Sequence, residues 1–255
     1  MTTRLTFTPG NHTYWLADSA GKRQRIPSVS ALKKTLHTFD NDTWKAGQIA
    51  DAITDDWDTI AALPPTSRQA AMQSAGLRRL AVAREFGTAV HAYAAQLWTG
   101  EAVEVPDEYR GHVQSLADWW GNQGIRPVAA ESLCWADDDG FGAGPMAGTL
   151  DLIIDHPAYG RGILDLKTWR PGSSGAPRGE EWCFQLAAYA AMETLVQDGE
   201  DTPFPRIHWV GVLHVGPGGV RLFKASSTDW GRARLQVEAA RVLKTLTKPK
   251  MEEIA

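Results

Sequence analysis

Three charged residues lie in two short apolar segments near the middle of the chain. Asp151 interrupts the segment 149–154, Asp165 interrupts the segment 162–166, and Lys167 follows two residues later. A connection containing Pro and Gly joins the two segments, which predicts a β-hairpin. Because side chains alternate along a strand, Asp165 and Lys167 are expected on one face. Unpaired charges are costly to bury, so two carboxylates beside an ammonium indicate a divalent metal.

Hard oxygen ligands of this kind suit Mg²⁺ or Mn²⁺, which assist phosphoryl chemistry by stabilising charge on the attacked phosphate and by activating water. The ammonium of Lys167 could orient that water or stabilise negative charge. Asp-x-Lys alone is a common pattern, and a solvated ion pair on an edge strand is the alternative interpretation. The upstream sequence 148–151 (Gly-Thr-Leu-Asp) favours the metal site.

Two further residues are candidate metal ligands. His91 follows Gly87 in a predicted helix of mostly Ala and Val neighbours, and a neutral imidazole is a capable ligand. The alternative for His91 is an ordinary core or surface residue, and close packing would explain the helical Gly87. Glu131, in the strand predicted before the hairpin, could add a ligand on the sheet surface or face water.

Gln185 and Tyr189 are four residues apart in a predicted helix, so their side chains share one helical face. In one interpretation they pack against the sheet together with Leu186 and Ala190. In the other they meet the substrate or position Lys167.

The elements that must position these residues follow from periodicity and turn signals. The N-terminal half is predicted to contain a small hairpin (4–25), a short helix after 26–30, a helix that begins near 42, a long helix over 67–98 with a possible interruption at Gly87, and a helix over 106–122. A strand (128–135) and the hairpin above follow. The chain then continues with a loop that contains Arg170 and Arg178 (169–179), a helix (181–197), a second hairpin (208–215 and 220–225) and a final helix (229–246). This order predicts an α/β (α+β) fold in which helices flank a central mixed β-sheet.

The 255 residues can form one domain. We expect an N-terminal hairpin and helical part (about 1–80), a core (about 81–225) and a C-terminal helix (226–255). With a net charge of −4, a polyanionic partner would need a local basic patch. No apolar run approaches the length of a membrane span and the start lacks a signal-peptide core, so we expect a cytoplasmic protein with no membrane partner.

Taken together, five separated segments resemble the PD-(D/E)XK nuclease superfamily, and specifically its RecB-like exonuclease branch. The segments, in the expected order, are 87–91 (Gly-Thr-Ala-Val-His), Glu131, 148–151, 165–167 (Asp-Leu-Lys) and 185–189 (Gln-Leu-Ala-Ala-Tyr). The resemblance covers roughly residues 84–190. The sequence 26–30 (Ile-Pro-Ser-Val-Ser) with the later Trp44-Lys45 also looks like phage-encoded relatives.

The resemblance implies a restriction-endonuclease-like core and a role for each residue. His91, Asp151 and Asp165 would ligate Mg²⁺ or Mn²⁺, helped by the Leu166 carbonyl and Glu131. Lys167 would be the catalytic lysine, and Gln185 with Tyr189 would form the Gln-x-x-x-Tyr element. Several relatives carry a four-cysteine iron–sulfur cluster, which the two cysteines of this chain, Cys134 and Cys183, cannot build.

The expected function is therefore that of a metal-dependent DNA exonuclease acting on linear DNA with a free end. The helical N-terminal part would shape a channel for the strand end, with aromatic and Arg side chains for stacking and phosphate contact. The alternative is a nucleic-acid-binding module on the same fold whose cleavage is vestigial or regulatory. A carboxylate-based glycosidase is a third possibility, but it gives Lys167 and His91 no task.

Overall fold

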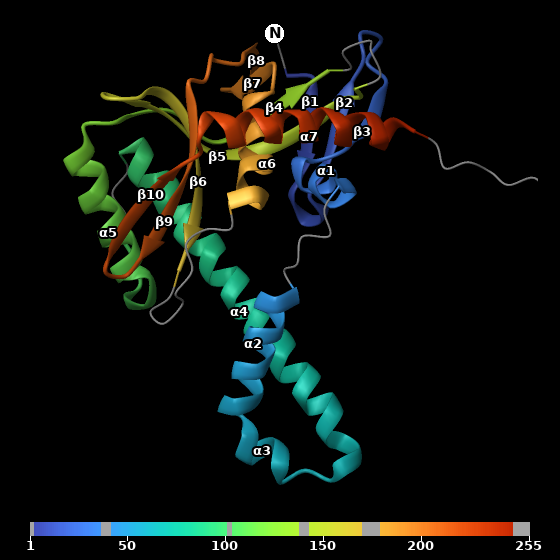
Figure 1. Cartoon of the computed structure of the whole chain (residues 1–255), viewed down its shortest axis with the longest axis vertical. Helices are drawn as coiled ribbons and strands as arrows, with labels where there is room; N and C mark the ends of the chain where they lie inside the picture. The colour runs from blue at the N-terminus through green and yellow to red at the C-terminus, as the bar shows by residue number, and fades with distance from the viewer. Residues whose placement is uncertain (1–2, 37–41, 101–103, 138–142, 170–178, 247–255) are drawn as a thin grey trace, which may run out of the picture.

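The structure, a computed structural model, describes residues 3–36, 42–100, 104–137, 143–169 and 179–246 of the chain. Within these residues, seven α-helices accompany a seven-stranded mixed sheet and a separate three-stranded sheet (Figure 1). The predicted α/β class with a central mixed sheet is confirmed. No helix in this described part of the chain is both long and apolar enough to cross a membrane.

The central sheet has the strand order β10-β9-β6-β5-β4-β7-β8. Its strands are β4 (Arg126–Ala136), β5 (Met146–His156), β6 (Gly160–Thr168), β7 (Thr194–Gln197), β8 (Glu200–Pro203), β9 (Trp209–Gly216) and β10 (Gly219–Lys224). Neighbours pair antiparallel except β6 with β9, which pair in parallel. The two predicted hairpins are β5–β6 and β9–β10, and β6 lies between two partners instead of at an edge.

Helices cover both faces of this sheet and bury its alternating apolar side chains. One core cluster combines residues of α1 (Val29–Leu36), α6 (Gly179–Ala190) and α7 (Ser227–Thr245) with the strands, including the fully buried Phe184 and Ile153. A second cluster on the other face combines the C-terminal half of α4 (Pro65–Thr99) and α5 (Asp107–Gln123) with strand residues such as Leu164. Burial of apolar area in these two layers is the main source of stability.

The N-terminal region forms the three-stranded sheet, with β1 (Leu5–Thr8), β2 (Thr13–Ala17) and β3 (Arg23–Ile26) in sequential order. A 3-10 turn, η1 (Pro9–Asn11), joins β1 to β2. Apolar side chains of this small sheet pack on Trp135 and Ala147 of the central sheet. Downstream of β3, Ser28 pairs with Ala147 in an isolated parallel bridge, and its Oγ accepts a hydrogen bond from Ala31 N, which is typical of a helix N-cap.

A helical arm made of α2 (Asp42–Asp55), α3 (Trp57–Ala61) and the N-terminal half of α4 projects away from the sheets (Figure 1). The helix α4 continues without a break from this arm to the face of the central sheet, so the predicted interruption at Gly87 is wrong. A Cβ at Gly87 would meet Thr168 Oγ1 at 3.8 Å, an ordinary contact, so close packing does not require glycine there. The side chains of Trp44 and Lys45 lie outside the described residues.

The prediction of one helix over 181–197 is wrong in its second half. The helix α6 ends at Ala190, and the chain continues as the β7–β8 hairpin, whose β7 pairs with β4. Asp198 and Gly199 form the turn, with φ values of 52° and 78°. Two successive residues with positive φ are typical of a type I′ hairpin turn, for which Asp-Gly is a preferred pair. The predicted loop with Arg170 and Arg178 lies outside the described residues.

Candidate metal site

The candidate site lies where two paired strands separate. The pairing of β5 with β6 ends at Leu152 and Leu164, one residue before Asp151 and Asp165, although both strands continue. Beyond this point a side chain of β5 takes the place of a backbone partner for β6. Oδ2 of Asp151 accepts a hydrogen bond of 2.7 Å from Leu166 N. Separation of the strands opens space for functional side chains at the centre of the sheet.

Three potential metal ligands from three elements meet beside this opening. Nδ1 of His91, on α4, lies 3.6 Å from Oδ2 of Asp151 and 3.6 Å from Oε1 of Glu131, on β4. One possible ligand atom from each residue lies within 4.8 Å of the other two. Glu131 faces Asp151 across the sheet, since its neighbours Ala130 and Ser132 pair with the two neighbours of Asp151. The three predicted ligands are therefore brought together.

Asp165 and Lys167 form an ion pair inside the same opening. Oδ2 of Asp165 lies 2.6 Å from Nζ of Lys167, and Oδ1 accepts a 2.8 Å hydrogen bond from Nε2 of Gln185, on α6. Asp165 is only 2% exposed, so the alternative of a solvated pair on an edge strand is wrong. Asp165 does not belong to the group of three mutually close ligands, and its two oxygens face Gln185 and Lys167.

Tyr189 and Tyr14 hold β5 in place two residues before Asp151. The Tyr189 hydroxyl donates a 2.7 Å hydrogen bond to the Thr149 carbonyl, and the Tyr14 hydroxyl lies 3.0 Å from Thr149 Oγ1. Gly148 permits this approach, because a Cβ there would lie only 2.6 Å from Tyr189 Cε1. Gln185 and Tyr189 thus share one face of α6, as predicted, and both contact the hairpin strands. Leu166 contacts the site through its backbone N–H, which donates to Asp151, and its carbonyl as a metal ligand stays a prediction.

The charges of the site perturb its titration. Burial, and after it the negative charge of Asp165, raise the pKa of the Asp151 carboxyl to about 6. Burial lowers the pKa of His91, but the nearby carboxylates of Glu131 and Asp151 outweigh it and raise this pKa overall. Burial also opposes the charged form of Lys167, yet the charges of Asp165 and Asp151 raise its pKa. Lys167 is therefore an ammonium at neutral pH.

The donor set fits a divalent cation. Carboxylate oxygens suit Mg²⁺ and Mn²⁺, and an imidazole nitrogen is also a common metal ligand. The raised pKa of Asp151 shows that negative charge at this position lacks full compensation from His91 and Lys167. A cation held by His91, Glu131 and Asp151 would supply that compensation, and Asp165 could join them if it released its present donors.

A cavity of about 340 Å³ gives access to the carboxylates, and its other wall comes from the N-terminal region. Side chains from the small sheet and the start of α1 line this wall, namely Phe7, His12, Tyr14, Ser28 and Ser30. The N-terminal lining of this cavity comes in equal parts from β1, β2 and their connection (Phe7, His12 and Tyr14) and from the start of α1 (Ser28, Val29 and Ser30). The channel expected from the helical N-terminal part stays a prediction. No local sequence signal links this N-terminal wall to carboxylates that follow about 100 or more positions later in the chain.

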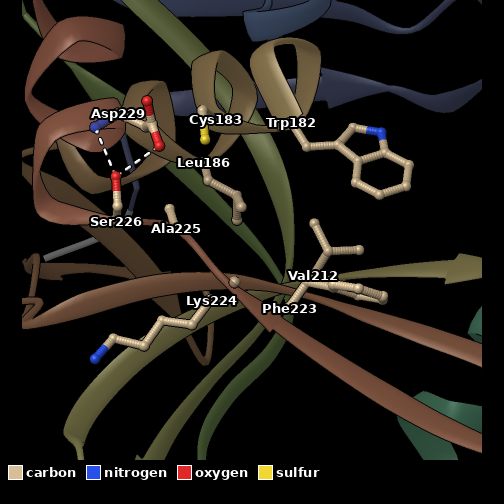
Figure 2. Close-up of a pocket in the computed structure, with 10 residues that line it drawn as sticks. Trp182, Cys183, Leu186, Val212, Phe223, Lys224, Ala225, Ser226 and Asp229 are labelled. Carbon is tan, nitrogen blue, oxygen red and sulfur yellow. Dashed lines mark hydrogen bonds between the residues drawn. The ribbon is translucent and has the colours of Figure 1, made fainter. Parts of the chain in front are cut away.

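A second cavity, of about 220 Å³, lies between α6, α7 and the β9–β10 hairpin (Figure 2). Trp182, Leu186 and Phe223 give it apolar walls. The carboxylate of Asp229 accepts a hydrogen bond from Ser226 Oγ, and this pair caps α7. Since the acid serves the helix terminus, this cavity offers no comparable set of converging ligands among its described lining residues.

No protein-family model matches the chain, and no curated protein matches it. A functional assignment therefore depends on the residues and geometry of the site itself.

Proposed function

We propose that this protein is a metal-dependent DNA exonuclease that hydrolyses phosphodiester bonds in linear DNA, in recombination, repair or phage DNA processing. One observation carries the proposal: His91, Glu131 and Asp151 converge beside the Asp165–Lys167 ion pair where β5 and β6 separate. The order of these residues in the chain is the one that resembles the RecB-like branch of the PD-(D/E)XK superfamily.

His91, Glu131, Asp151 and Asp165 would hold Mg²⁺ or Mn²⁺. When bound, such a cation neutralises phosphate charge and makes a water molecule more nucleophilic. The carboxylates contribute by giving the buried site a negative potential that attracts the cation before a phosphate arrives.

Lys167 acts as a hydrogen-bond donor. Its raised pKa keeps it protonated, so it does not accept a proton from water at neutral pH. Instead the ammonium orients the water and stabilises negative charge that develops on the attacked phosphate. In the hydrolysis, an oxygen of water bonds to phosphorus and the bond from phosphorus to one ester oxygen breaks. One proton of the water ends on the leaving ester oxygen, and the other remains on the phosphate monoester or passes to solvent.

Two residues of α6 position this machinery. Gln185 donates to Oδ1 of Asp165 and so fixes the orientation of this carboxylate, whose Oδ2 faces Lys167 and would also face the cation. Tyr189 fixes the backbone of β5 near Asp151 through the Thr149 carbonyl. Since catalytic groups must be held within a fraction of an ångström, loss of either contact should lower turnover more than it lowers DNA affinity.

The test is hydrolysis of linear DNA, labelled at either end, by the purified protein with Mg²⁺ or Mn²⁺. We expect labelled mononucleotides or short products with the wild type, a loss of at least about a hundredfold with Lys167→Ala, and no loss with Lys244→Ala, an exposed lysine of α7. Equal hydrolysis by Lys167→Ala would contradict the mechanism. Salt-sensitive DNA binding without hydrolysis would instead favour the alternative, a binding module on this fold.

A further inference from the structure

The wall of the cavity opposite the carboxylates is aromatic. Phe7 of β1 and Tyr14 of β2 are cross-strand partners, and their rings stack with centroids 4.8 Å apart and an interplanar angle of 27°. His12, in the connection between the strands, tilts toward Phe7 with ring centroids 5.8 Å apart. All three residues line the same cavity as Asp151 and Lys167.

This wall is fixed to the strand that carries Asp151. Tyr14 is 5% exposed and bonds Thr149, and Ala147 N donates to the carbonyl of Pro27 just after β3. The small sheet and β5 are therefore held together at several points. A group resting on the aromatic wall would keep a defined position relative to the carboxylates.

Tyr14 belongs to the core of the small sheet and Phe7 packs against that core, but the rings of Phe7 and His12 are not fully covered by it. Phe7 is only half-buried, and His12 is exposed and adopts a left-handed φ of 48°. The three carboxylates of this cavity would hold a cation, and the cation would attract a phosphate. Partly exposed rings beside them therefore suit a ligand that is both flat and attached to a phosphate. A nucleobase is such a ligand, because every base offers a π-face that stacks on aromatic side chains whatever its sequence.

We propose that Phe7 and His12 form a stacking subsite for an unpaired nucleobase, so that the substrate is single-stranded DNA. The inference rests on the proposed function, since it places the base next to the phosphate that meets Asp151 and Lys167. In a duplex the faces of each base are covered by its neighbours, and exposing them requires unstacking and unpairing. The cavity, at about 340 Å³, lies near the lower end of small-ligand pockets, which suits one nucleotide rather than a base pair.

The experiment measures binding in EDTA, where hydrolysis does not interfere, by fluorescence anisotropy with the full chain. The probes are a labelled single strand, the blunt duplex containing it, and a fully abasic strand of equal length that keeps the phosphates. The variants are Phe7→Ala, Phe7→Leu and Trp15→Ala. Trp15 is the matched control because it follows Tyr14 in β2 and so faces the opposite side of the small sheet.

We expect the wild type to bind the single strand more tightly than the duplex. Phe7→Ala and Phe7→Leu should weaken binding of the intact strand about tenfold and leave binding of the abasic strand unchanged. Phe7→Leu keeps an apolar side chain against the small-sheet core, so a cooperative thermal unfolding transition of this variant would exclude misfolding as the cause. Trp15→Ala should bind every probe as the wild type does.

The proposal is overturned if the Phe7 variants weaken both strands equally, if Trp15→Ala has the same effect, if the duplex binds as tightly as the single strand, or if no DNA binds. Failure of the proposed function has a different signature. Stacking-dependent binding without hydrolysis in Mn²⁺ would contradict only the nuclease assignment, whereas hydrolysis without the Phe7 effect would contradict only the subsite.

Discussion

Oε1 of Glu131 lies 3.6 Å from Nδ1 of His91, and Glu131 makes this approach with a left-handed backbone φ of 44°. A residue with a Cβ pays roughly 1–2 kcal/mol for that conformation. Sparsely populated backbone conformations concentrate at functional sites, where the surrounding structure holds them. The side chain of Glu131 remains 38% exposed, so packing alone does not explain the strain.

The strain at Glu131 predicts a difference between two substitutions that both delete the carboxylate. Glu131→Gly should be about 1 kcal/mol more stable than Glu131→Ala in chemical denaturation, because glycine adopts positive φ freely. Both variants should bind Mn²⁺ at least about tenfold more weakly than the wild type in calorimetry. As a control, Asp198→Gly replaces another positive-φ residue, in the β7–β8 turn, and should leave Mn²⁺ affinity unchanged. Equal stabilities of the Ala and Gly variants would contradict the strain argument.

Asp151 should cost the protein stability when no cation is bound. Its pKa is raised from 3.8 to about 6, so the folded state binds the proton more tightly than the unfolded state does. The free energy of unfolding should therefore fall as pH rises from about 4 to about 6 and stay lower above that range. In EDTA at pH 8, Asp151→Asn should be about 1–3 kcal/mol more stable than the wild type, and this advantage should vanish near pH 4.

Denaturation curves across pH test the Asp151 prediction, with exposed Asp58→Asn as a control that should change stability by less than about 0.5 kcal/mol. The Asn side chain keeps an oxygen to accept from Leu166 N, so the backbone contact survives. The same variant should lose hydrolysis. A stability of Asp151→Asn below that of the wild type at pH 8 would show that His91 and Lys167 already compensate the charge fully.

Two glycine substitutions should act in opposite directions. Gly148→Ala places a methyl group 2.6 Å from Tyr189 Cε1, which forces the ring away from β5 and should destabilise the fold by about 1–3 kcal/mol. Gly121, in α5, has open space around it, so Gly121→Ala should stabilise the fold by up to about 1 kcal/mol. Thermal unfolding of both variants is the measurement, and an unchanged Gly148→Ala would mean that Tyr189 moves at no cost.

The central hairpin could be predicted from the sequence because the signals for it, two apolar strand segments and a turn between them, are adjacent in the chain. Asp151, Asp165 and Lys167 stand in apolar β segments whose period fixes which side chains share a face. The face shared by Gln185 and Tyr189 follows from helical geometry in the same way. Convergence of His91 and Glu131 on Asp151 could be expected only from the resemblance, since no periodicity relates α4 to β4.

Other features escaped prediction for physical reasons. The residues of β7 continue the apolar pattern of α6, and they form a strand because they pair with Cys134 and Trp135 of β4, a tertiary contact. The Asp198-Gly199 pair was an available local signal of that hairpin. Phe7 and His12 reach the cavity through packing of the small sheet on β4 and β5, which the sequence does not encode locally.

The central claim is that the opening between β5 and β6 is a divalent-cation site. An anomalous difference map from crystals of the protein grown with Mn²⁺ tests it most directly. We predict a peak bounded by His91, Glu131, Asp151 and Asp165, and no peak there in crystals of Asp151→Asn. A map with Mn²⁺ bound only elsewhere, or with no peak at a Mn²⁺ concentration that supports hydrolysis, would contradict the claim.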